Sequence, residues 1–330
     1  MIVVDFMARA VCLAIAAAIG AGWLAGLGLA AAPSPLIAIL GWAADTLSQF
    51  QLVYAAGLFA ALAVLALRRR WRVVAVCIPL VASVGVQLWP YLQPIVPPAQ
   101  AAAGRELRVA ALNLWFRNDR PDAVMRWIAE ADADLLVLSE VTRDIRRALA
   151  PALARYPYQL GAVGGSRADV LILSRLALTP LPVGRRGDGE YLVHARLCLD
   201  GAADDPARRC LRVIGAHLPS PVSPAHVAER DRLLALIGGL MAEAEGEARI
   251  VLGDLNTTPW APGFRVLLGR GRLADSAQGR GLHPTWNARL PLAVVPIDHI
   301  LVGGPVAVAA RTVGPFVHSD HLPVTALLRL

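Results

Sequence analysis

The sequence has no lysine. All 32 of its basic residues are arginine, and alanine is abundant. This pattern is typical of a genome-wide composition bias, so the formal net charge of +7 says little about function. Residues 1–104 hold five arginines against Asp5 and Asp45, a net charge of +3, which leaves +4 for residues 105–330. Such a weakly basic domain does not by itself favour nucleic acid as the substrate.

Charged residues are also scarce, at 17% of the chain, whereas 56% is hydrophobic and the mean hydropathy is +0.52. A soluble protein of average composition is excluded, and a membrane portion is indicated. A hydrocarbon core of roughly 30 Å needs about 20 apolar helical residues. Three uncharged stretches meet or approach this length, namely residues 10–32, 50–67 and 73–91. We therefore predict a membrane domain at residues 1–92 with three transmembrane helices, and an interfacial helix at Leu36–Ser48.

The arginines of this region predict its orientation. Arg68, Arg69, Arg70 and Arg72 lie between the second and third apolar stretches, and such clusters are retained in the cytoplasm. Three spans then carry the rest of the chain outside. We expect a multi-pass membrane protein whose later domain lies outside the cytoplasm. Cleavage of a signal peptide after residues 29–33 is an alternative that would leave that domain on the same side.

Only four cysteines are present, and two of them bear on the compartment. Cys198 and Cys210 lie in strand-like runs joined by a loop rich in Gly, Asp and Pro. If the two runs form a hairpin, both cysteines lie near its loop end. They could then form a disulfide, which would agree with an oxidising exterior, or remain two buried thiols.

Residues 93–104 are rich in Pro and Ala and read as a linker, and residues 105–330 have the size of one domain. Apolar strands are predicted at 107–112, 134–138, 170–173, 211–216, 250–252, 294–297 and 316–317, with helices beginning at Pro121 and Ser223. Most of these strands end in residues able to bind a metal or move a proton: Asn113, Glu140, His217, Asp254 with Asn256, Asp298, and Asp320 with His321. We expect these strand ends to converge on one site in an α/β sandwich of two sheets with outer helices.

Each of these groups has a chemical use at such a site. Glu140, with Asp254 and Asp320 as further candidate ligands, offers the oxygen donors that Mg²⁺ or Mn²⁺ prefers. Asp298 can orient the imidazole of His321, which can then activate a water molecule. The remaining candidates, which would hold phosphate oxygens or assist the reaction, are His217, Asn113 and Asn256. This combination predicts metal-assisted hydrolysis of a phosphate ester.

At these positions the chain resembles the endonuclease/exonuclease/phosphatase superfamily, which includes DNase I-like nucleases, neutral sphingomyelinases and inositol phosphatases. The matching segments, in family order, are 111–113, 138–141, 215–218, 253–256, 297–300 and 319–324. The resemblance implies a four-layer α/β sandwich of two mostly antiparallel sheets, Mg²⁺ dependence, Glu140 as metal ligand and His321 as catalytic histidine paired with Asp298. Ser139 departs from the pattern, since the family usually has Gln there. The apolar N-terminal region is similar to the bacterial membrane-anchored branch that includes VanJ-type and YafD-type proteins. This resemblance implies a multi-pass protein of a bacterial inner (plasma) membrane with a periplasmic or extracellular catalytic domain.

Several functions stay open on sequence alone. The favoured one is a membrane-anchored phosphoesterase that acts on a phosphate mono- or diester, such as a lipid-linked or envelope phosphate, and has the lipid bilayer as a partner. The alternative of an extracytoplasmic nuclease requires a basic, aromatic-lined groove, for which the sequence offers little support. A binding or resistance protein on an inactive scaffold is the third alternative. Zinc is disfavoured because His318 and His321 have no third ligand at zinc spacing.

Overall fold

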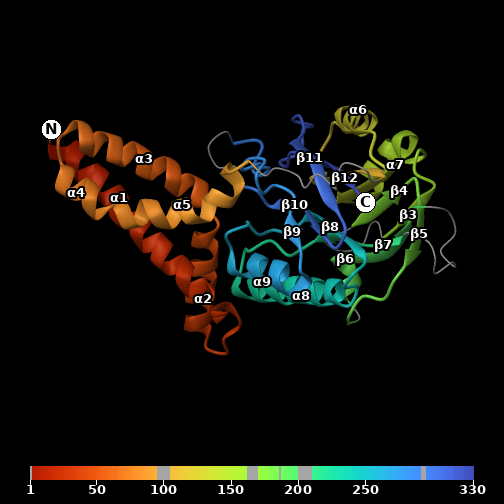
Figure 1. The fold of residues 1–330 in the computed structure, drawn as a ribbon, viewed down its shortest axis with the longest axis horizontal. Helices are drawn as coiled ribbons and strands as arrows, with labels where there is room; N and C mark the ends of the chain where they lie inside the picture. Colours follow the sequence, from red (N-terminus) through yellow and green to blue (C-terminus); the bar gives the residue numbers. More distant parts are fainter. Residues whose placement is uncertain (1, 95–104, 162–169, 186, 200–209, 291–294) are drawn as a thin grey trace.

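The computed structural model describes residues 2–94, 105–161, 170–185, 187–199, 210–290 and 295–330 (Figure 1). Residues 105–330 contain two six-stranded sheets. The first has the order β11-β12-β1-β2-β4-β3, formed by Ala307–Val313, Val324–Arg329, Glu106–Asn113, Leu135–Ser139, Leu171–Ser174 and Tyr158–Leu160. The second has the order β5-β6-β7-β8-β10-β9, formed by Ala177–Pro180, Leu192–Cys198, Cys210–His217, Ala248–Asp254, Asp298–Gly303 and Ala274–Asp275. A short 3₁₀ turn at Asp188–Glu190 precedes β6.

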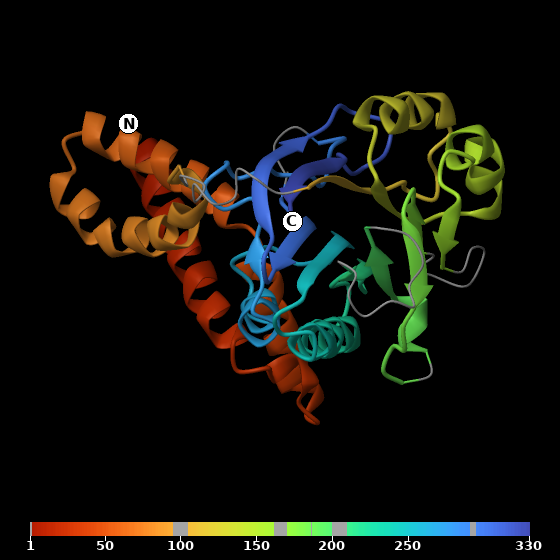
Figure 2. The same cartoon turned by 45° about the vertical axis from the view of Figure 1, so that its right-hand side comes forward.

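The alternation of side chains along each strand explains the layering. On β1, Leu107, Val109 and Ala111 point into the core between the two sheets, whereas Ala110 and Leu112 point outward. Helices α6 (Pro121–Ala131) and α7 (Arg143–Leu153) cover the outer face of the first sheet. Helices α8 (Pro224–Ala242) and α9 (Pro262–Gly271) cover the second (Figures 1 and 2). The predicted four-layer sandwich is confirmed, with mixed sheets, because β1 pairs with β2 and β7 with β8 in parallel.

Two predicted strands are misplaced. Residues 294–297 and 316–317 were expected to be strands that end at the site, but β10 begins at Asp298 and β12 begins after His321. Val294 lies outside the described residues, and Phe316 and Val317 lie in a loop. The reason is that β10 runs antiparallel to β8, and β12 antiparallel to β1. An antiparallel strand begins at the edge where its neighbour ends, so the site collects strand starts as well as strand ends.

Residues 2–92 form a helical region beside the sandwich (Figures 1 and 2), with α1 (Ile2–Ala25), a 3₁₀ turn (Leu29–Ala31), α2 (Pro35–Ser48), α3 (Gln51–Leu67), α4 (Trp71–Val76) and α5 (Ile78–Leu92). Among the described residues, α1 alone is long and apolar enough to cross a membrane as a single helix. The pair α2 and α3 meets the same test together but is bent by 66°. A membrane anchor or a signal sequence would both fit α1, and three spans stay a prediction.

The surface of the helical region is unusually apolar. Most large apolar side chains that are exposed in the described residues belong to this region, including Phe6, Leu13, Trp23, Phe59 and Val86. On the sandwich, exposure of this kind is limited to Phe116, Tyr158, Val222, Val266, Leu290 and Phe316. Apolar patches of this extent on a monomer indicate a covered surface, such as a membrane or a partner protein.

Cys198 and Cys210 face each other across the antiparallel pair β6 and β7 and form a disulfide. The hairpin interpretation is therefore confirmed, and the open question of two free thiols is answered. Cys12 and Cys77 are buried free thiols in the helical region. The predicted linker at 93–104 lies almost wholly outside the described residues.

We expect the double variant Cys198→Ala/Cys210→Ala to lower the free energy of unfolding by about 3 kcal/mol, because the bond closes a loop with a sequence separation of 12. Thermal unfolding of the full chain, with and without reductant, measures this change. Reductant should destabilise the wild type to the level of the double variant and leave the variant unchanged. A reduced wild type as stable as the oxidised one would contradict the prediction.

Candidate active site

Strand register brings the predicted site residues to one edge of the sandwich. Asn113 lies opposite Ser139 in the pairing of β1 with β2, and Glu140 follows directly. Asp254 at the end of β8 lies opposite both His217 of β7 and Asp298 of β10. Consequently His217, Asp254 and Asp298, which are far apart in the sequence, lie side by side on adjacent strands of the second sheet.

Asp254 is at the centre of the hydrogen-bond network. Its Oδ2 accepts from Nδ2 of Asn113 at 3.0 Å and from Nδ2 of Asn256 at 3.3 Å, and its Oδ1 accepts from the backbone N–H of Asn256 at 2.8 Å. Burial raises the pKa of this carboxyl to about 6, although His321 opposes the rise. The backbone just before Asp254 requires glycine at position 253. A Cβ atom there would lie 2.1 Å from the carbonyl oxygen of Ala216, and the φ of +132° is one that other residues rarely adopt.

Glu140 and Asn113 form the side of the site contributed by the first sheet. Nδ2 of Asn113 also donates to Oε1 of Glu140 at 3.0 Å, while Oε2 of Glu140 accepts from the backbone N–H of Phe116 at 2.8 Å. One amide therefore bridges the carboxylates of Glu140 and Asp254. Glu140 adopts a left-handed φ of 56°, a conformation that costs roughly 1–2 kcal/mol outside glycine and persists only when neighbours hold it.

His321 and Asp298 form the predicted carboxylate–imidazole pair. Nδ1 of His321 lies 2.8 Å from Oδ2 of Asp298, and its Nε2 lies 3.7 Å from Oδ2 of Asp254. Burial lowers the pKa of His321, but the carboxylates of Asp298 and Asp254 outweigh burial and raise that pKa to about 10. Two hydroxyl groups hold the backbone of this pair. Thr285 Oγ1 accepts a hydrogen bond from the backbone N–H of Asp298, and Ser319 Oγ accepts one from the backbone N–H of His321.

His217 lies between the two carboxylates that Asn113 bridges. Its Nε2 is 3.7 Å from Oδ2 of Asp254 and 3.8 Å from Oε1 of Glu140. Asn256, which has a left-handed φ of 47°, donates its side-chain N–H to the carbonyl of Leu218 at 2.8 Å. The structure thus brings together the seven residues Asn113, Glu140, His217, Asp254, Asn256, Asp298 and His321.

The donor set fits a metal ion. Ligand atoms of Asp254, Asp298 and His321 lie within 4.8 Å of one another, and Glu140 adds a third carboxylate through the Asn113 bridge. Oδ1 of Asp298 is buried and accepts no hydrogen bond from the described residues. Carboxylates gathered in a buried place and incompletely paired are the chemistry that a hard divalent cation balances. Asp320 does not belong to this cluster; instead its carboxylate accepts from Nε1 of Trp286 at 3.3 Å.

Two further histidines, His299 and His318, lie apart from this chemistry. Nε2 of His299 lies 2.9 Å from the carbonyl oxygen of Thr257, and the imidazole ring packs against Phe264. His318 packs against the ring of Phe316. Thr285 and Ser319, by contrast, support the pair of Asp298 and His321, although the sequence did not predict this role. For Ser319 the only signal is its place in the family segment 319–324.

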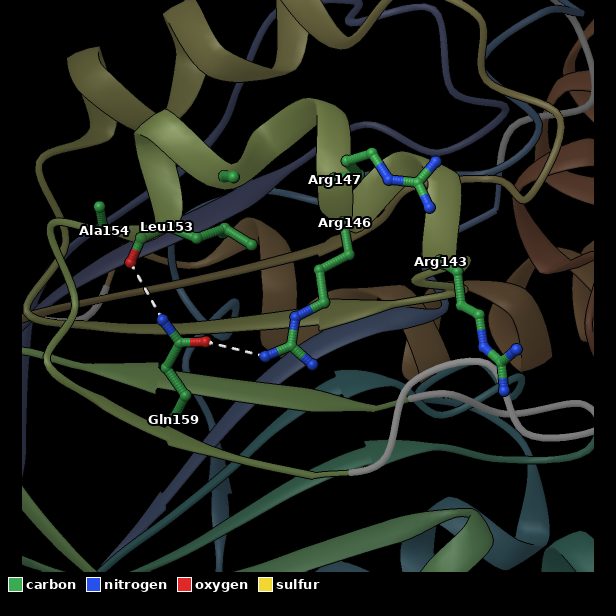
Figure 3. A pocket seen from close by; sticks show the side chains of 7 residues that line it. Arg143, Arg146, Arg147, Leu153, Ala154 and Gln159 are labelled. Atoms are coloured by element: carbon green, nitrogen blue, oxygen red, sulfur yellow. Dashed lines mark hydrogen bonds between the residues drawn. The ribbon is translucent and has the colours of Figure 1, made fainter.

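A cavity of about 550 Å³ lies elsewhere, beside α7 (Figure 3). It is lined by Arg143, Arg146 and Arg147, but their guanidinium groups point in different directions in Figure 3. Arg146 donates to Oε1 of Gln159 at 3.3 Å, and Arg147 forms an ion pair with Asp144. None of the seven gathered residues lines this cavity. It is therefore separate from the candidate site and lies against a polar face of α7.

A two-sheet α/β sandwich with carboxylates, amides and imidazoles gathered at one sheet edge defines a class of hydrolases that includes phosphoesterases and nucleases. A family model agrees: residues 110–321 match the Endonuclease/Exonuclease/phosphatase family. Since the match covers more than half of the chain, the protein belongs to that family. No curated protein sequence gave a match.

Solved structures with the same fold include an endonuclease/exonuclease/phosphatase from Bacteroides vulgatus, with 18% sequence identity, a TM-score of 0.55, and coverage of 68% of this chain and 99% of that chain. TDP2 from D. rerio, solved in complex with a single-strand DNA product, has 16% identity and a TM-score of 0.54, covering 68% and 99%. A family protein from Bacteroides thetaiotaomicron has 17% identity and a TM-score of 0.52, covering 68% and 98%. At these identities the likeness concerns the fold alone.

Proposed function

We propose that the protein is a membrane-anchored, divalent-metal-dependent phosphoesterase that hydrolyses a phosphate mono- or diester outside the cytoplasm, with a lipid-linked or envelope phosphate as substrate. The observation that carries the chemistry is the hydrogen-bonded pair of Asp298 and His321, in which Nε2 of His321 faces Asp254. A carboxylate that orients an imidazole beside a phosphate-binding edge is suited to activating a water molecule.

In this proposal the positive charge of the bound cation would lower the raised pKa of His321, so that the neutral imidazole can remove the proton from the attacking water. Asp298 keeps the imidazole in the required tautomer. Glu140 and Asp254 would hold Mg²⁺ or Mn²⁺, which when bound would supply positive charge for the phosphoryl oxygens. His217 and Asn256 lie beside the place where those oxygens would be. Because Asn113 donates to both Glu140 and Asp254, its main task is to set the spacing between these two carboxylates.

Membrane attachment is supported by the distribution of charge along the helical region. The N-terminus and the α3–α4 connection lie at the end away from the sandwich (Figures 1 and 2). There Arg70 pairs with Asp5 at 2.7 Å, and Arg68, Arg69 and Arg72 are close in sequence. A basic end retained in the cytoplasm would direct the sandwich outward. The Cys198–Cys210 disulfide agrees with that side of the membrane.

A substrate in or on the membrane is supported by the position of the catalytic loop. Residues 254–260 lead directly from Asp254 to Trp260, whose buried indole belongs to the apolar cluster of the helical region. Nε1 of Trp260 donates to the carbonyl of Gln49, between α2 and α3. The candidate site therefore lies only a few residues from the helices that would contact the bilayer.

A substrate panel with the full chain in nanodiscs tests the proposal. We expect Mg²⁺-dependent release of phosphate or alcohol from lipid phosphates such as phosphatidic acid, abolished by EDTA and restored by added Mg²⁺. Plasmid DNA and soluble nitrophenyl esters are the comparison substrates. Faster cleavage of DNA would favour the nuclease alternative, and the absence of hydrolysis of any ester would refute an enzymatic role.

A further inference from the structure

The helical region contacts the catalytic loop through a buried arginine of α8. The Arg230 side chain is completely buried. Its Nη2 donates to Oδ1 of Asp45 in α2 at 2.8 Å, and its Nε and Nη2 donate to Oδ1 of Asp231 at 3.0 and 2.8 Å. Its Nη1 donates to the backbone carbonyl of Asn256 at 3.2 Å. One guanidinium therefore joins the helical region to the loop that carries Asp254 and Asn256.

A second contact comes from Gln49, at the end of α2. Its Oε1 accepts from both the backbone N–H and the hydroxyl of Thr258, each at 2.8 Å. Its Nε2 donates to Oδ2 of Asp45 at 3.3 Å, which links the two contacts. We refer to Asp45, Gln49 and Arg230 as the α2 clamp. All three residues are buried, and the clamp holds the catalytic loop at Asn256 and Thr258.

The clamp has the properties of a positioning device. Arginine presents a rigid planar fork, so its several hydrogen bonds fix the direction of each partner more closely than a lysine ammonium could. A buried guanidinium is tolerated only when its partners are all in place, so the docking of α2 and the conformation of the loop depend on each other. Asn256 needs such support, because it holds a left-handed backbone conformation beside Asp254.

We propose that Arg230, anchored by Asp45 and supported by Gln49, is a positioning residue for the catalytic loop, so that hydrolysis requires the docked helical region. The proposal rests on the phosphoesterase function proposed above. A shift of the Asn256 carbonyl moves the backbone that presents Asp254 to His321. A misplacement of about 1 Å in a catalytic site can lower turnover by roughly 100-fold.

The test compares Arg230→Lys and Gln49→Leu with Arg232→Lys in the full chain. Arg230→Lys keeps the buried positive charge but loses the planar guanidinium and its several hydrogen bonds. Gln49→Leu removes no charged group from the clamp, so this second variant is expected to fold even if Arg230→Lys does not. Arg232 is the matched control, because it lies on the same helix and pairs with Asp188 and Glu229, away from the loop. The measurements are amide hydrogen exchange of the peptide covering residues 254–260, and kcat and KM well below the melting temperature.

We expect both clamp variants to speed amide exchange in residues 254–260 and to lower kcat by roughly 10- to 100-fold, with KM changed by less than about threefold. Arg232→Lys should match the wild type in both measurements. Clamp variants with unchanged exchange, or with faster exchange and an unchanged kcat, would overturn the proposal. A wild type inactive on every ester would refute the proposed function, while the exchange measurement still decides whether α2 holds the loop.

Discussion

Replacing His321 with alanine is expected to lower kcat by roughly 10²- to 10⁴-fold, the usual contribution of a positioned general base. The expectation follows from the geometry, because Nδ1 of His321 is bound to Asp298 and only Nε2 faces the centre of the site. Asp298→Asn should also impair turnover, since an amide can turn its N–H toward the imidazole and favour the wrong tautomer. Steady-state kinetics on the preferred substrate of the panel measure both effects.

The control for His321→Ala is His226→Ala. His226 lies at the start of α8, where its Nδ1 is 3.2 Å from the carbonyl oxygen of Ser220 and its backbone N–H donates to the hydroxyl of Ser223, neither of which is one of the seven gathered residues. We expect this variant to retain wild-type kcat and KM. Turnover by His321→Ala within a few-fold of wild type would exclude His321 as the base and would leave the imidazole with a structural role.

Glu140→Gln should have the second largest effect. The substitution keeps the size of the side chain but removes one of the carboxylates that surround Asn113, so the proposed cation site loses a charged ligand. We expect the Mg²⁺ concentration needed for half-maximal rate to rise by at least about 10-fold and kcat to fall by roughly 100-fold. Mn²⁺ binding followed by electron paramagnetic resonance reports the loss of affinity without relying on activity.

Glu130→Gln provides the matched control, because Glu130 is exposed on α6 and outside the site. It should bind Mn²⁺ as the wild type does. Equal Mn²⁺ affinity in Glu140→Gln and wild type would remove Glu140 from the ligand set and leave Asp254, Asp298 and His321 as the remaining group.

Much of the fold and site follows from local sequence. The strands that end at Asn113, His217 and Asp254 are apolar runs closed by a polar residue, and such runs are visible without a structure. Asp298 and His321 are neighbours as predicted, but the described residues of 294–297 and 316–317, just before them, do not form strands of either sheet. Short apolar segments at 294–297 and 316–317 have the composition of strands. Pairing partners, which are not local, decide that β10 and β12 begin later.

The α2 clamp could not be found by the same means. Asp45 and Gln49 lie about 180 positions before Arg230, and burial is a property of the packed molecule. Two signals were nevertheless present. Asp45 is the one acid in the apolar stretch 36–48, and Arg230 interrupts the apolar face of α8 between Val227 and Leu234. A charged residue at a core-facing position implies a buried partner, and here each of the two is the partner of the other.

The separation of Asp45 and Arg230 also has a consequence for biosynthesis. A ribosome that adds roughly 5 to 20 residues per second needs about 10 to 40 seconds to cover the 185 residues between them. During that interval Asp45 has been synthesised but Arg230 has not. The contact between α2 and α8 through Asp45 and Arg230 therefore cannot form until at least 230 residues have been translated.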